Sequence, residues 1–332
     1  MPLINDLGNG RTTLHGVVLD AESMGNTSLE PILALADDWQ VHQFSSPEQV
    51  SERIRDADLV LGNKSIITGA AIAQTQQLKL IAIMATGTNN VDLVAAQAKG
   101  VAVCNVTAYG TPAVAQHTMA LMLNLATQIP NYLLDVTQGK WQQSRVFGLL
   151  EHPIIELSGK TLGIVGNGEL GQAVAKLGEA FGMQVLISKR PNQGSGGSDR
   201  VPFHELLGRA DFLSLHCPLT PENRQLINSE TLALLSPGSF LINTARGGLV
   251  DSKALINALT NGKLAGAALD TLDVEPPLPG DPLISAAAHL PNLFITPHNA
   301  WGAIESRHRL VLQVAENISC FLNGRPRNLV TD

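Results

Sequence analysis

The sequence predicts an α/β protein made of two doubly wound domains, each a parallel sheet flanked by helices. The chain has 332 residues, more than one hydrophobic core usually serves, so two domains are expected. Hydrophobic residues make up 44% and charged residues only 15%, which indicates a folded, aliphatic interior. Short aliphatic runs alternate with helical patterns in two separate stretches, and this alternation is typical of parallel sheets.

The first alternating stretch runs from His15 to about residue 106. Its aliphatic runs have the length of strands, and amphipathic or Ala-rich segments between them predict helices. Strands are expected at 16–20, 40–44, 58–63, 78–85 and 101–106, with helices at 28–36, 46–57 and 91–100. This order predicts one doubly wound unit.

A long helix is expected next, over residues 111–128. Pro112 lies in its first turn, where proline is tolerated, and apolar residues nearly encircle the helix, so it should be largely buried. The stretch that follows, to about Leu157, contains Trp141 and is interpreted as polar. A second series of strands is expected at 160–166, 184–188, 211–216, 239–244, 264–270 and 293–297, before a final helix over 303–321.

Charge and composition argue against several kinds of partner. The net charge of −7 is scattered and no basic block is present, so no nucleic-acid partner is expected. The apolar runs are far shorter than the ~20 residues that span a bilayer, and the first 13 residues do not look like a signal peptide, so we expect no membrane partner and a cytoplasmic location. Cys104, Cys217 and Cys320 lack metal-ligand spacing, so no metal site is expected.

A glycine-rich turn opens the second series. Gly166, Gly168 and Gly171 follow an aliphatic strand and precede a helical pattern, which is the context that a dinucleotide-binding turn requires. The first glycine would permit the tight turn, the second would let a pyrophosphate approach the backbone, and the third would let helix and strand pack closely. A glycine cluster at a helix start without any ligand is the alternative. In this context we expect a dinucleotide cofactor.

Three polar side chains, Arg246, Glu275 and His298, follow later strands at the points where those strands end. Ligands of open α/β sheets lie beside the carboxyl ends of the strands, so these residues are candidates for chemistry. A 2-oxo acid carries a negative charge and a carbonyl that gains a proton when hydride arrives, so its reduction needs a guanidinium and a general acid. Arg246 and His298 supply these groups, and Glu275 can orient the histidine and stabilise its imidazolium form.

The same residues carry a family resemblance. Their order, in the contexts RGG, EPP and TPH, resembles the D-isomer-specific 2-hydroxyacid dehydrogenases. The segments LKLIAIMATGTNNVDLVAA, LHCPLT, LINTARGGLVD and LAGAALDTLDVEPP are most similar to the glycerate dehydrogenase and hydroxypyruvate reductase branch. The resemblance covers nearly the whole chain from about residue 15. It implies an oxidoreductase of short 2-oxo and D-2-hydroxy acids, with glyoxylate and hydroxypyruvate as leading substrates.

The resemblance also implies a domain layout. Residues 1–106 and 301–332 would form a discontinuous, flavodoxin-like substrate domain. Residues 107–300 would form an inserted Rossmann domain that binds NAD or NADP. Two chains would associate as a homodimer through the cofactor domain.

Individual roles follow from the resemblance. Arg246 would hold the substrate carboxylate and carbonyl, His298 would be the acid/base, and Glu275 would pair with His298. The backbone of Ala85, Thr86 and Gly87 would also bind the carboxylate. Cofactor contacts would come from Glu169, Leu170, Cys217, Pro218, Thr244, Ala245 and Asp270, the last of these at the nicotinamide amide.

One position departs from the family pattern. Members that prefer NAD commonly carry an acidic residue at the end of the second Rossmann strand, where this chain has Ser188, Lys189 and Arg190. A guanidinium can pair with the 2′-phosphate of NADP, so we expect NADP to be favoured over NAD, with dual use as an alternative. A merely solvated strand end, with NAD held by the rest of the groove, is the other interpretation.

Two other functions are alternatives. A formate or phosphite dehydrogenase would share the fold, but a formate enzyme would not need Glu275. A corepressor-like scaffold would use a nicotinamide cofactor to set its assembly state, and the absence of basic tails or long Pro-rich segments argues against it. Among the remaining histidines only His216, at a strand end, is a candidate for a cofactor contact. His117 and the others are interpreted as structural or surface residues.

Overall fold

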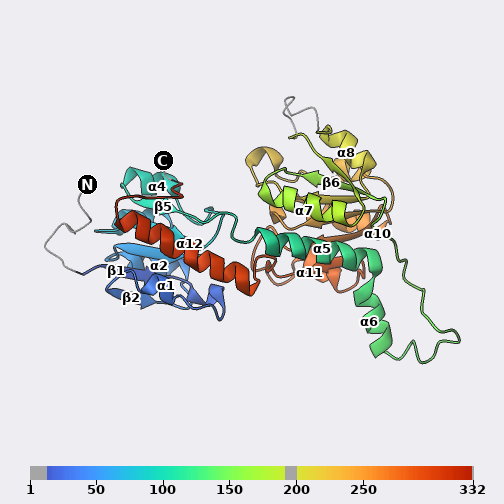
Figure 1. Cartoon of the computed structure of the whole chain (residues 1–332), viewed down its shortest axis with the longest axis horizontal. Coiled ribbons are helices and arrows are strands. Elements are labelled where there is room, and N and C mark those ends of the chain that lie inside the picture. Colours follow the sequence, from blue (N-terminus) through green and yellow to red (C-terminus); the bar gives the residue numbers. More distant parts are fainter. Residues whose placement is uncertain (1–12, 191–199, 331–332) are drawn as a thin grey trace. The chain divides into compact units, whose positions relative to one another are not determined.

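The computed structural model describes residues 13–190 and 200–330 and divides into two compact units (Figure 1). Unit 1 comprises Met1–Gly110 and Gly302–Asp332, and unit 2 comprises Thr111–Trp301. The expectation about a signal peptide concerns residues 1–12, which lie outside the described part of the chain.

Unit 1 is a five-stranded parallel sheet with the strand order β2-β1-β3-β4-β5. Its strands are β1 (His15–Val18), β2 (Asp38–Val41), β3 (Leu59–Gly62), β4 (Leu80–Ile83) and β5 (Ala102–Cys104). Its helices are η1 (Ala21–Met24), α1 (Glu30–Leu33), α2 (Pro47–Ile54), α3 (Gly69–Gln74), α4 (Leu93–Ala98) and α12 (Ile304–Leu322).

The core of unit 1 lies on the central strands. Every residue of β3 and β4 is buried, as expected for continuous aliphatic strands that helices cover on both faces. The last helix, α12, packs against α1 and β4. The chain after residue 302 therefore completes a unit whose sheet comes entirely from the N-terminal part of the sequence.

Two details of unit 1 differ from the prediction. The pattern does not predict α3, because its six residues are too few to show a helical period. The edge strand β2 begins two residues earlier than the predicted 40–44. The position of β2 is explained by packing, since the Trp39 ring lies directly over Gly16. Any side chain at residue 16 would collide with this ring.

Unit 2 is a six-stranded parallel sheet with the strand order β11-β10-β9-β8-β6-β7, and each predicted strand is confirmed. The strands are β6 (Thr161–Val165), β7 (Gln184–Ile187), β8 (Phe212–Leu215), β9 (Ser239–Asn243), β10 (Leu264–Leu269) and β11 (Leu293–Ile295). The helices are α5 (Thr111–Thr127), α6 (Ile129–Thr137), α7 (Glu169–Ala180), α8 (Phe203–Arg209), η2 (Pro221–Asn223), α9 (Ser229–Leu234), η3 (Gly247–Leu249), α10 (Ser252–Thr260) and α11 (Pro282–Ala287).

The strand order of unit 2 reverses beside β6. The strand β7 lies on one side of β6, and the chain then crosses over to place β8 on the other side. Ligands of doubly wound sheets bind at the carboxyl edge beside such a reversal. The loops that follow β6, β8, β9, β10 and β11 therefore lie where a ligand is expected to bind.

The helix α5 is the buried helix that the sequence predicts. It packs against α7, β9 and β10, and Met122 and Leu125 are completely buried. It ends at Thr127 because Gln128 adopts a left-handed backbone with φ 57°. Although α5 is apolar, no helix among residues 13–190 and 200–330 is long and apolar enough to cross a membrane.

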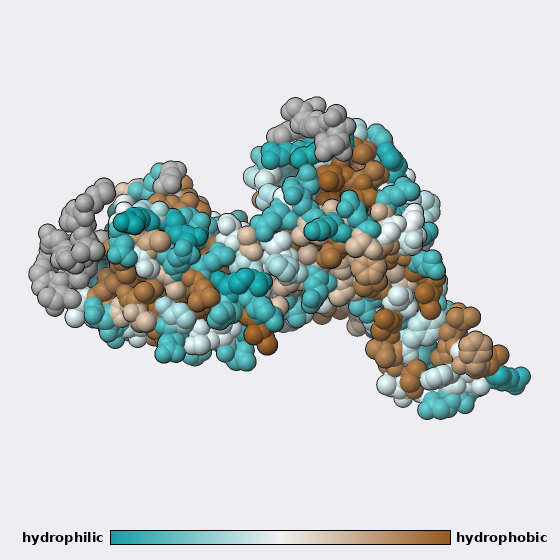
Figure 2. Space-filling view, viewed as in Figure 1, coloured by the Kyte–Doolittle hydropathy of each residue, from teal (hydrophilic) through white to brown (hydrophobic). Residues whose placement is uncertain are grey.

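The stretch after α5 corrects the interpretation of a polar segment and contains a helix that the sequence analysis did not predict. Pro130 starts the helix α6 instead of breaking it, because proline is tolerated in a first helical turn. Exposed apolar side chains occur along α6 and beyond it, at Ile129, Leu133, Leu134, Val136, Trp141, Val146, Phe147, Leu150 and Ile154. Figure 2 shows this hydrophobic surface over α6 and the following segment. We call residues 129–154 the arm.

Candidate active site

The glycine turn between β6 and α7 has the geometry that a dinucleotide needs. Gly166 has φ +105°, and a Cβ there would lie 2.5 Å from the carbonyl oxygen of His216. A Cβ on Gly171 would overlap the carbonyl oxygen of Gly166, so the helix can pack this closely only with glycine. Around Gly168, in contrast, the space is open. A phosphate can therefore approach the backbone at the N-terminus of α7, where Glu169 and Leu170 begin the helix.

Three buried polar atoms at this edge of the sheet have no hydrogen-bond partner within the described part of the chain. They are Asn167 Oδ1 after β6, His216 Nδ1 after β8 and Thr271 Oγ1 after β10. Buried polar groups are normally hydrogen-bonded, so unpaired ones beside a ligand site suit a ligand with its own donors and acceptors. The residues present therefore fit a dinucleotide cofactor.

His216, at the same edge of the sheet, is an uncharged histidine. Burial lowers the pKa of its imidazole to about 3, so the ring carries no charge at neutral pH. Its Nε2 lies 2.8 Å from the hydroxyl of Ser214. The adjacent Cys217 is half-buried, and its backbone nitrogen lies against the glycine turn, where a Cβ on Gly166 would come within 2.7 Å of it. Pro218 follows at the surface.

Two cations lie next to the glycine turn. The strand β7 pairs with β6, so the residues that follow β7 lie at the same edge of the sheet. Ser188 is buried, and Lys189 donates its backbone N–H to Val201 at 2.8 Å. The side chain of Lys189 is half-buried and that of Arg190 is exposed, and neither forms an ion pair with another described residue. Both are available to an anionic ligand.

Arg246 lies on a tightly constrained turn after β9. The side chain of Asn243, which is fully buried, donates to the carbonyl oxygen of Arg246 at 2.9 Å and accepts from the N–H of Ala245 at 3.0 Å. Gly247 packs so closely on the backbone of Leu272 and Asp273 that no larger residue fits. The turn that carries Arg246 is therefore held directly against the segment that leads to Glu275.

Glu275 and His298 form a hydrogen-bonded pair. The Nδ1 atom of His298 lies 2.6 Å from Oε2 of Glu275, and the other carboxylate oxygen accepts from the N–H of Leu272 at 2.8 Å. Both side chains are partly exposed, so the pair is accessible from solvent. Because Nδ1 faces the carboxylate, Nε2 is the ring nitrogen left for proton transfer to a ligand.

Asp270, at the end of β10, is 1% exposed and accepts several hydrogen bonds from the segment after β11. Its Oδ1 accepts from the Thr296 hydroxyl at 2.5 Å and from the N–H of Asn299 at 3.1 Å. Its Oδ2 accepts from the N–H of Ala300 at 3.1 Å. Thr244 and Ala245, after the neighbouring strand β9, are also buried at this edge. The carboxylate therefore ties the end of β10 to the turn that presents His298.

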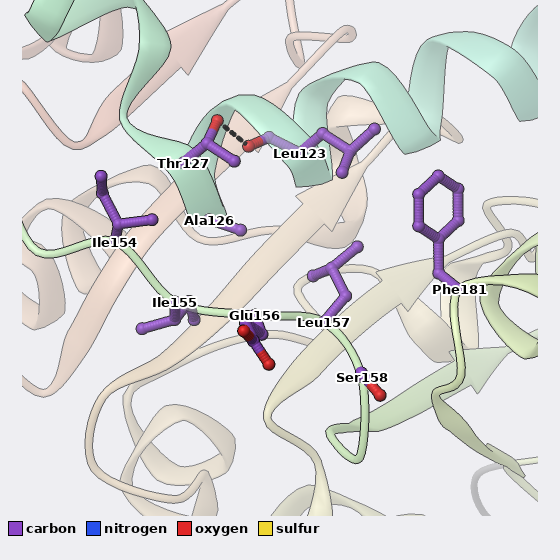
Figure 3. A pocket seen from close by; sticks show the side chains of 9 residues that line it. All are labelled: Leu123, Ala126, Thr127, Ile154, Ile155, Glu156, Leu157, Ser158 and Phe181. Carbon is purple, nitrogen blue, oxygen red and sulfur yellow. Dashed lines mark hydrogen bonds between the residues drawn. The ribbon is translucent and has the colours of Figure 1, made fainter.

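The structure brings the cofactor and acid/base candidates to one edge of unit 2, whereas Ala85, Thr86 and Gly87 belong to unit 1. They follow β4 at its carboxyl end, and the carbonyl oxygen of Thr86 accepts from Asn105 at 2.7 Å. Unit 2 also contains a hollow of about 370 Å³ that none of the candidate residues line. Figure 3 shows the residues that line it. Leu123, Leu157 and Phe181 line it at the C-terminal end of α5, so this hollow is a separate, mainly apolar feature.

The structure adds two residues to the site to which the sequence analysis assigned no role. His117, on α5, has its Nε2 3.1 Å from the Thr296 hydroxyl and 3.5 Å from Asp270 Oδ1. No motif marks His117, and Thr296 appears in the sequence only as the threonine of the TPH context of His298. Their meeting depends on how α5 packs on the sheet, so only the structure could reveal it.

Comparisons with known proteins agree with this geometry. A family model for the NAD binding domain of D-isomer specific 2-hydroxyacid dehydrogenases matches residues 119–300, which is more than half of the chain and lies within unit 2. The chain is 38% identical over 316 residues to the glycerate dehydrogenase of Methylorubrum extorquens, covering 95% of this chain and 98% of that protein.

Solved structures show the same fold. The D-lactate dehydrogenase of Aquifex aeolicus, complexed with NAD and lactic acid, matches with a TM-score of 0.83 and 28% identity over 96% of this chain and 99% of its own. The NADPH-dependent glyoxylate/hydroxypyruvate reductase of Sinorhizobium meliloti matches with a TM-score of 0.81 and 26% identity over 96% of this chain and 97% of its own.

These findings confirm the fold class, the dependence on NAD or NADP and the oxidoreductase class that the sequence predicts. The dinucleotide turn, the neighbouring cations and the Glu275–His298 pair all lie within or beside the matched domain. The chain belongs to the D-isomer specific 2-hydroxyacid dehydrogenase family.

Proposed function

We propose that the protein reduces short 2-oxo acids to D-2-hydroxy acids, with glyoxylate and hydroxypyruvate as the leading substrates. The observation that carries this proposal is the Glu275–His298 pair, at 2.6 Å, on the same sheet edge as the Arg246 turn. A positive charge and a protonated imidazole are the two groups that a 2-oxo acid needs as its carbonyl becomes a hydroxyl.

Each residue has a distinct role in this reaction. The guanidinium of Arg246 binds the substrate carboxylate and polarises the carbonyl. His298 donates a proton from Nε2 to the carbonyl oxygen, and Glu275 stabilises the imidazolium through Nδ1. The nicotinamide cofactor supplies the hydride that C2 of the substrate accepts. One hydride and one proton thus convert the oxo group into a hydroxyl, and His298 recovers its proton from water.

Other residues bind the two ligands. The glycine turn, with the backbone of Glu169 and Leu170, holds the pyrophosphate. Cys217, Pro218, Thr244, Ala245 and Asp270 line the rest of the cofactor groove. In unit 1, the backbone of Ala85, Thr86 and Gly87 binds the substrate carboxylate, so we assign the substrate domain to residues 1–106 and 301–332 and the cofactor domain to residues 107–300.

A kinetic screen tests the proposed function. Oxidation of NADPH and of NADH is followed by absorbance with glyoxylate, hydroxypyruvate, pyruvate and other 2-oxo acids. We expect turnover with glyoxylate or hydroxypyruvate at the highest kcat/KM. Cofactor binding without turnover on any acid would instead favour a binding protein.

The cations after β7 predict a preference for NADPH. Their removal should raise the KM for NADPH far more than the KM for NADH, because only NADPH offers a phosphate at this position. For Arg190→Ala or Lys189→Asp we expect the KM for NADPH to rise by up to about tenfold. This is the equivalent of one lost charge-assisted contact of ~1.4 kcal/mol. Steady-state kinetics with each cofactor measures the ratio. Lys176→Ala, on α7 in the same unit, is a matched control for loss of a cation. An unaltered protein with higher kcat/KM for NADH would refute the preference.

We also propose that two chains associate through the arm. Phe147 is 98% exposed and Leu150 is 85% exposed, although a monomer rarely leaves so many large apolar side chains in water. Inside the arm, Lys140 and His152 both hydrogen-bond to the buried Asp135, so polar contacts shape the segment while its apolar side chains face outward. A second copy is the partner that the family resemblance suggests. The apolar hollow of Figure 3 adjoins the arm at Ile154 and offers further surface to a second copy.

Light scattering coupled to size-exclusion chromatography measures this association. We expect a mass near twice 35.2 kDa for the unaltered protein. Phe147→Asp combined with Leu150→Asp should shift the mass toward the monomer, because a charge would be buried unpaired in the interface. Val94→Asp, at a 79% exposed position in unit 1, is the matched control and should leave the mass unchanged. A monomeric unaltered protein would contradict the proposal.

The cysteines support a cytoplasmic location, which we also propose. Cys104, Cys217 and Cys320 are all free thiols. Burial raises the pKa of Cys104 to about 12 and also raises that of Cys217, so neither is a reactive thiolate at neutral pH. Free thiols are typical of proteins that work in a reducing compartment.

A further inference from the structure

We propose that His117 is a positioning residue for His298, acting through Thr296 and Asp270. This inference rests on the proposed function, because it assigns His117 a role only through the acid/base residue. It does not require His117 to touch either ligand. All four residues belong to unit 2.

The backbone at His298 needs external support. Its φ is 51°, in the left-handed region that residues other than glycine enter at a cost, although histidine tolerates it better than most. The N–H of His298 is bonded to the carbonyl oxygen of Thr296 at 2.9 Å, which closes a very tight turn. Such a conformation persists only where the surrounding structure enforces it.

Asp270, at the end of β10, holds the backbone around His298 in this conformation. Its carboxylate accepts from Thr296, two residues before His298, and from the N–H groups of Asn299 and Ala300, immediately after it. The Asp270 backbone is itself anchored, since its N–H donates to Asn243 at 2.9 Å. The chain on both sides of His298 is thereby tied to one buried carboxylate.

The donors and acceptors of the remaining hydrogen bonds define the role of His117. A carboxylate can only accept, so the Thr296 hydroxyl must donate its hydrogen to Asp270 Oδ1. The Thr296 oxygen is then free to accept, and the donor facing it at 3.1 Å is Nε2–H of His117. The same Nε2 lies 3.5 Å from Asp270 Oδ1. His117 therefore acts as a hydrogen donor that fixes Thr296 and, with it, one side of the turn.

The packing of α5 places His117 in this position. Its helix α5 packs directly on β9 and β10, the strands that end at Arg246 and Asp270. The His117 side chain is 23% exposed, so its replacement leaves the buried core of α5 intact. Asp270 is the charged group that contacts His117, and the Glu275–His298 pair lies along the same turn.

Paired substitutions test the role. His117→Leu removes the donor, while His117→Gln keeps an N–H near the position of Nε2. In parallel, Thr296→Val removes the link and Thr296→Ser keeps it. A small displacement of a catalytic group can cost up to about 10²-fold, so we expect His117→Leu and Thr296→Val to lower kcat by about tenfold or more, with the KM for the cofactor within about twofold. The Gln and Ser variants should recover most of the loss.

Hydrogen exchange gives a second readout that needs no substrate. The N–H groups of Asn299 and Ala300 are bonded to Asp270, so peptides covering residues 296–301 should exchange faster in His117→Leu than in the unaltered protein or in His117→Gln. His289→Leu, at an exposed histidine of the same unit, is the matched control and should change neither readout.

The outcomes are distinct. Native kcat together with native exchange in His117→Leu would overturn the positioning role, as would a loss of kcat that His117→Gln fails to recover. A protein that reduces no 2-oxo acid would overturn the proposed function, and the exchange of residues 296–301 would still decide whether His117 holds the turn.

Discussion

Replacing His298 with alanine is expected to lower kcat for 2-oxo acid reduction by about 10² to 10⁴, the usual contribution of a positioned proton donor. The imidazole is held for this role, with Nδ1 2.6 Å from Glu275 and its backbone tied to Asp270 on both sides. Cofactor affinity should barely change, because the phosphate site that we propose is the glycine turn and does not include His298. Steady-state kinetics at saturating cofactor and a fluorescence titration of NADPH measure the two quantities.

Glu275→Gln is the matched variant for the pair. It keeps the size of the side chain and removes only its charge, so protonation of the facing ring becomes less favourable and reduction should fall off at lower pH than in the unaltered protein. Near-native turnover in His298→Ala would make the histidine structural and contradict the proton-transfer role. A pH profile that Glu275→Gln leaves unchanged would contradict the pairing.

Arg246→Lys is expected to reduce kcat/KM by about 10- to 100-fold, because a charged hydrogen bond is worth about 1.5–3 kcal/mol and an ammonium cannot replace a bidentate fork. The loss should appear in kcat as well as in KM, since in the proposed mechanism the guanidinium also polarises the carbonyl in the transition state. The surrounding turn should remain in place, because Asn243 and Gly247 hold it through the backbone. Steady-state kinetics with hydroxypyruvate measures the effect.

Arg209→Lys is the control for this change of cation. Arg209 lies on α8 in the same unit, and among the described residues its guanidinium pairs with Glu205 alone, across one turn of an exposed helix. An exposed pair of this kind contributes little, so this variant should retain native kinetics. Retention of more than about half of the native kcat/KM in Arg246→Lys would rule out bidentate recognition at Arg246.

The two sheets could be predicted because their strands are short aliphatic runs with clear breaks. The sequence signal failed where periodicity was short or misleading. The helix α3 has only six residues, and α6 begins with Ile129 and Pro130, which read as the end of a helix more readily than as its start. The register of β2 depends on the Trp39 ring packing over Gly16, a contact between two strands that no local pattern encodes.

The candidate site likewise contains residues that the sequence could predict and residues that it could not. Arg246, Glu275 and His298 could be proposed from sequence because each follows a strand and carries the required chemistry. The supporting residues could not, since His117 and Thr296 are 179 positions apart and meet only through packing of α5 on the sheet. Asp270 was expected at the nicotinamide, and the structure adds its hydrogen bonds to the His298 turn, which depend on backbone geometry.

In each unit a buried aspartate carboxylate accepts hydrogen bonds from the backbone of a loop. In unit 1, the buried carboxylate of Asp20 accepts from the N–H groups of Asn63, Lys64 and Ser65 at 2.7–2.8 Å. In unit 2, Asp270 does the same for the turn around His298. A buried carboxylate that accepts several backbone donors is a stable anchor, because each hydrogen bond offsets the cost of burying the charge. Each carboxylate thereby fixes the backbone of the loop that it binds.

Deuterium transfer tests the central claim most directly. Hydroxypyruvate is reduced with cofactor that carries deuterium at both hydrogen positions on C4 of its nicotinamide ring, in ordinary water, and the product is examined by mass spectrometry, NMR and chiral chromatography. If the protein moves a hydride to C2 and His298 adds a solvent-derived proton to oxygen, the product is D-glycerate with one deuterium on C2. Product without deuterium at C2, or of the L configuration, would contradict the account.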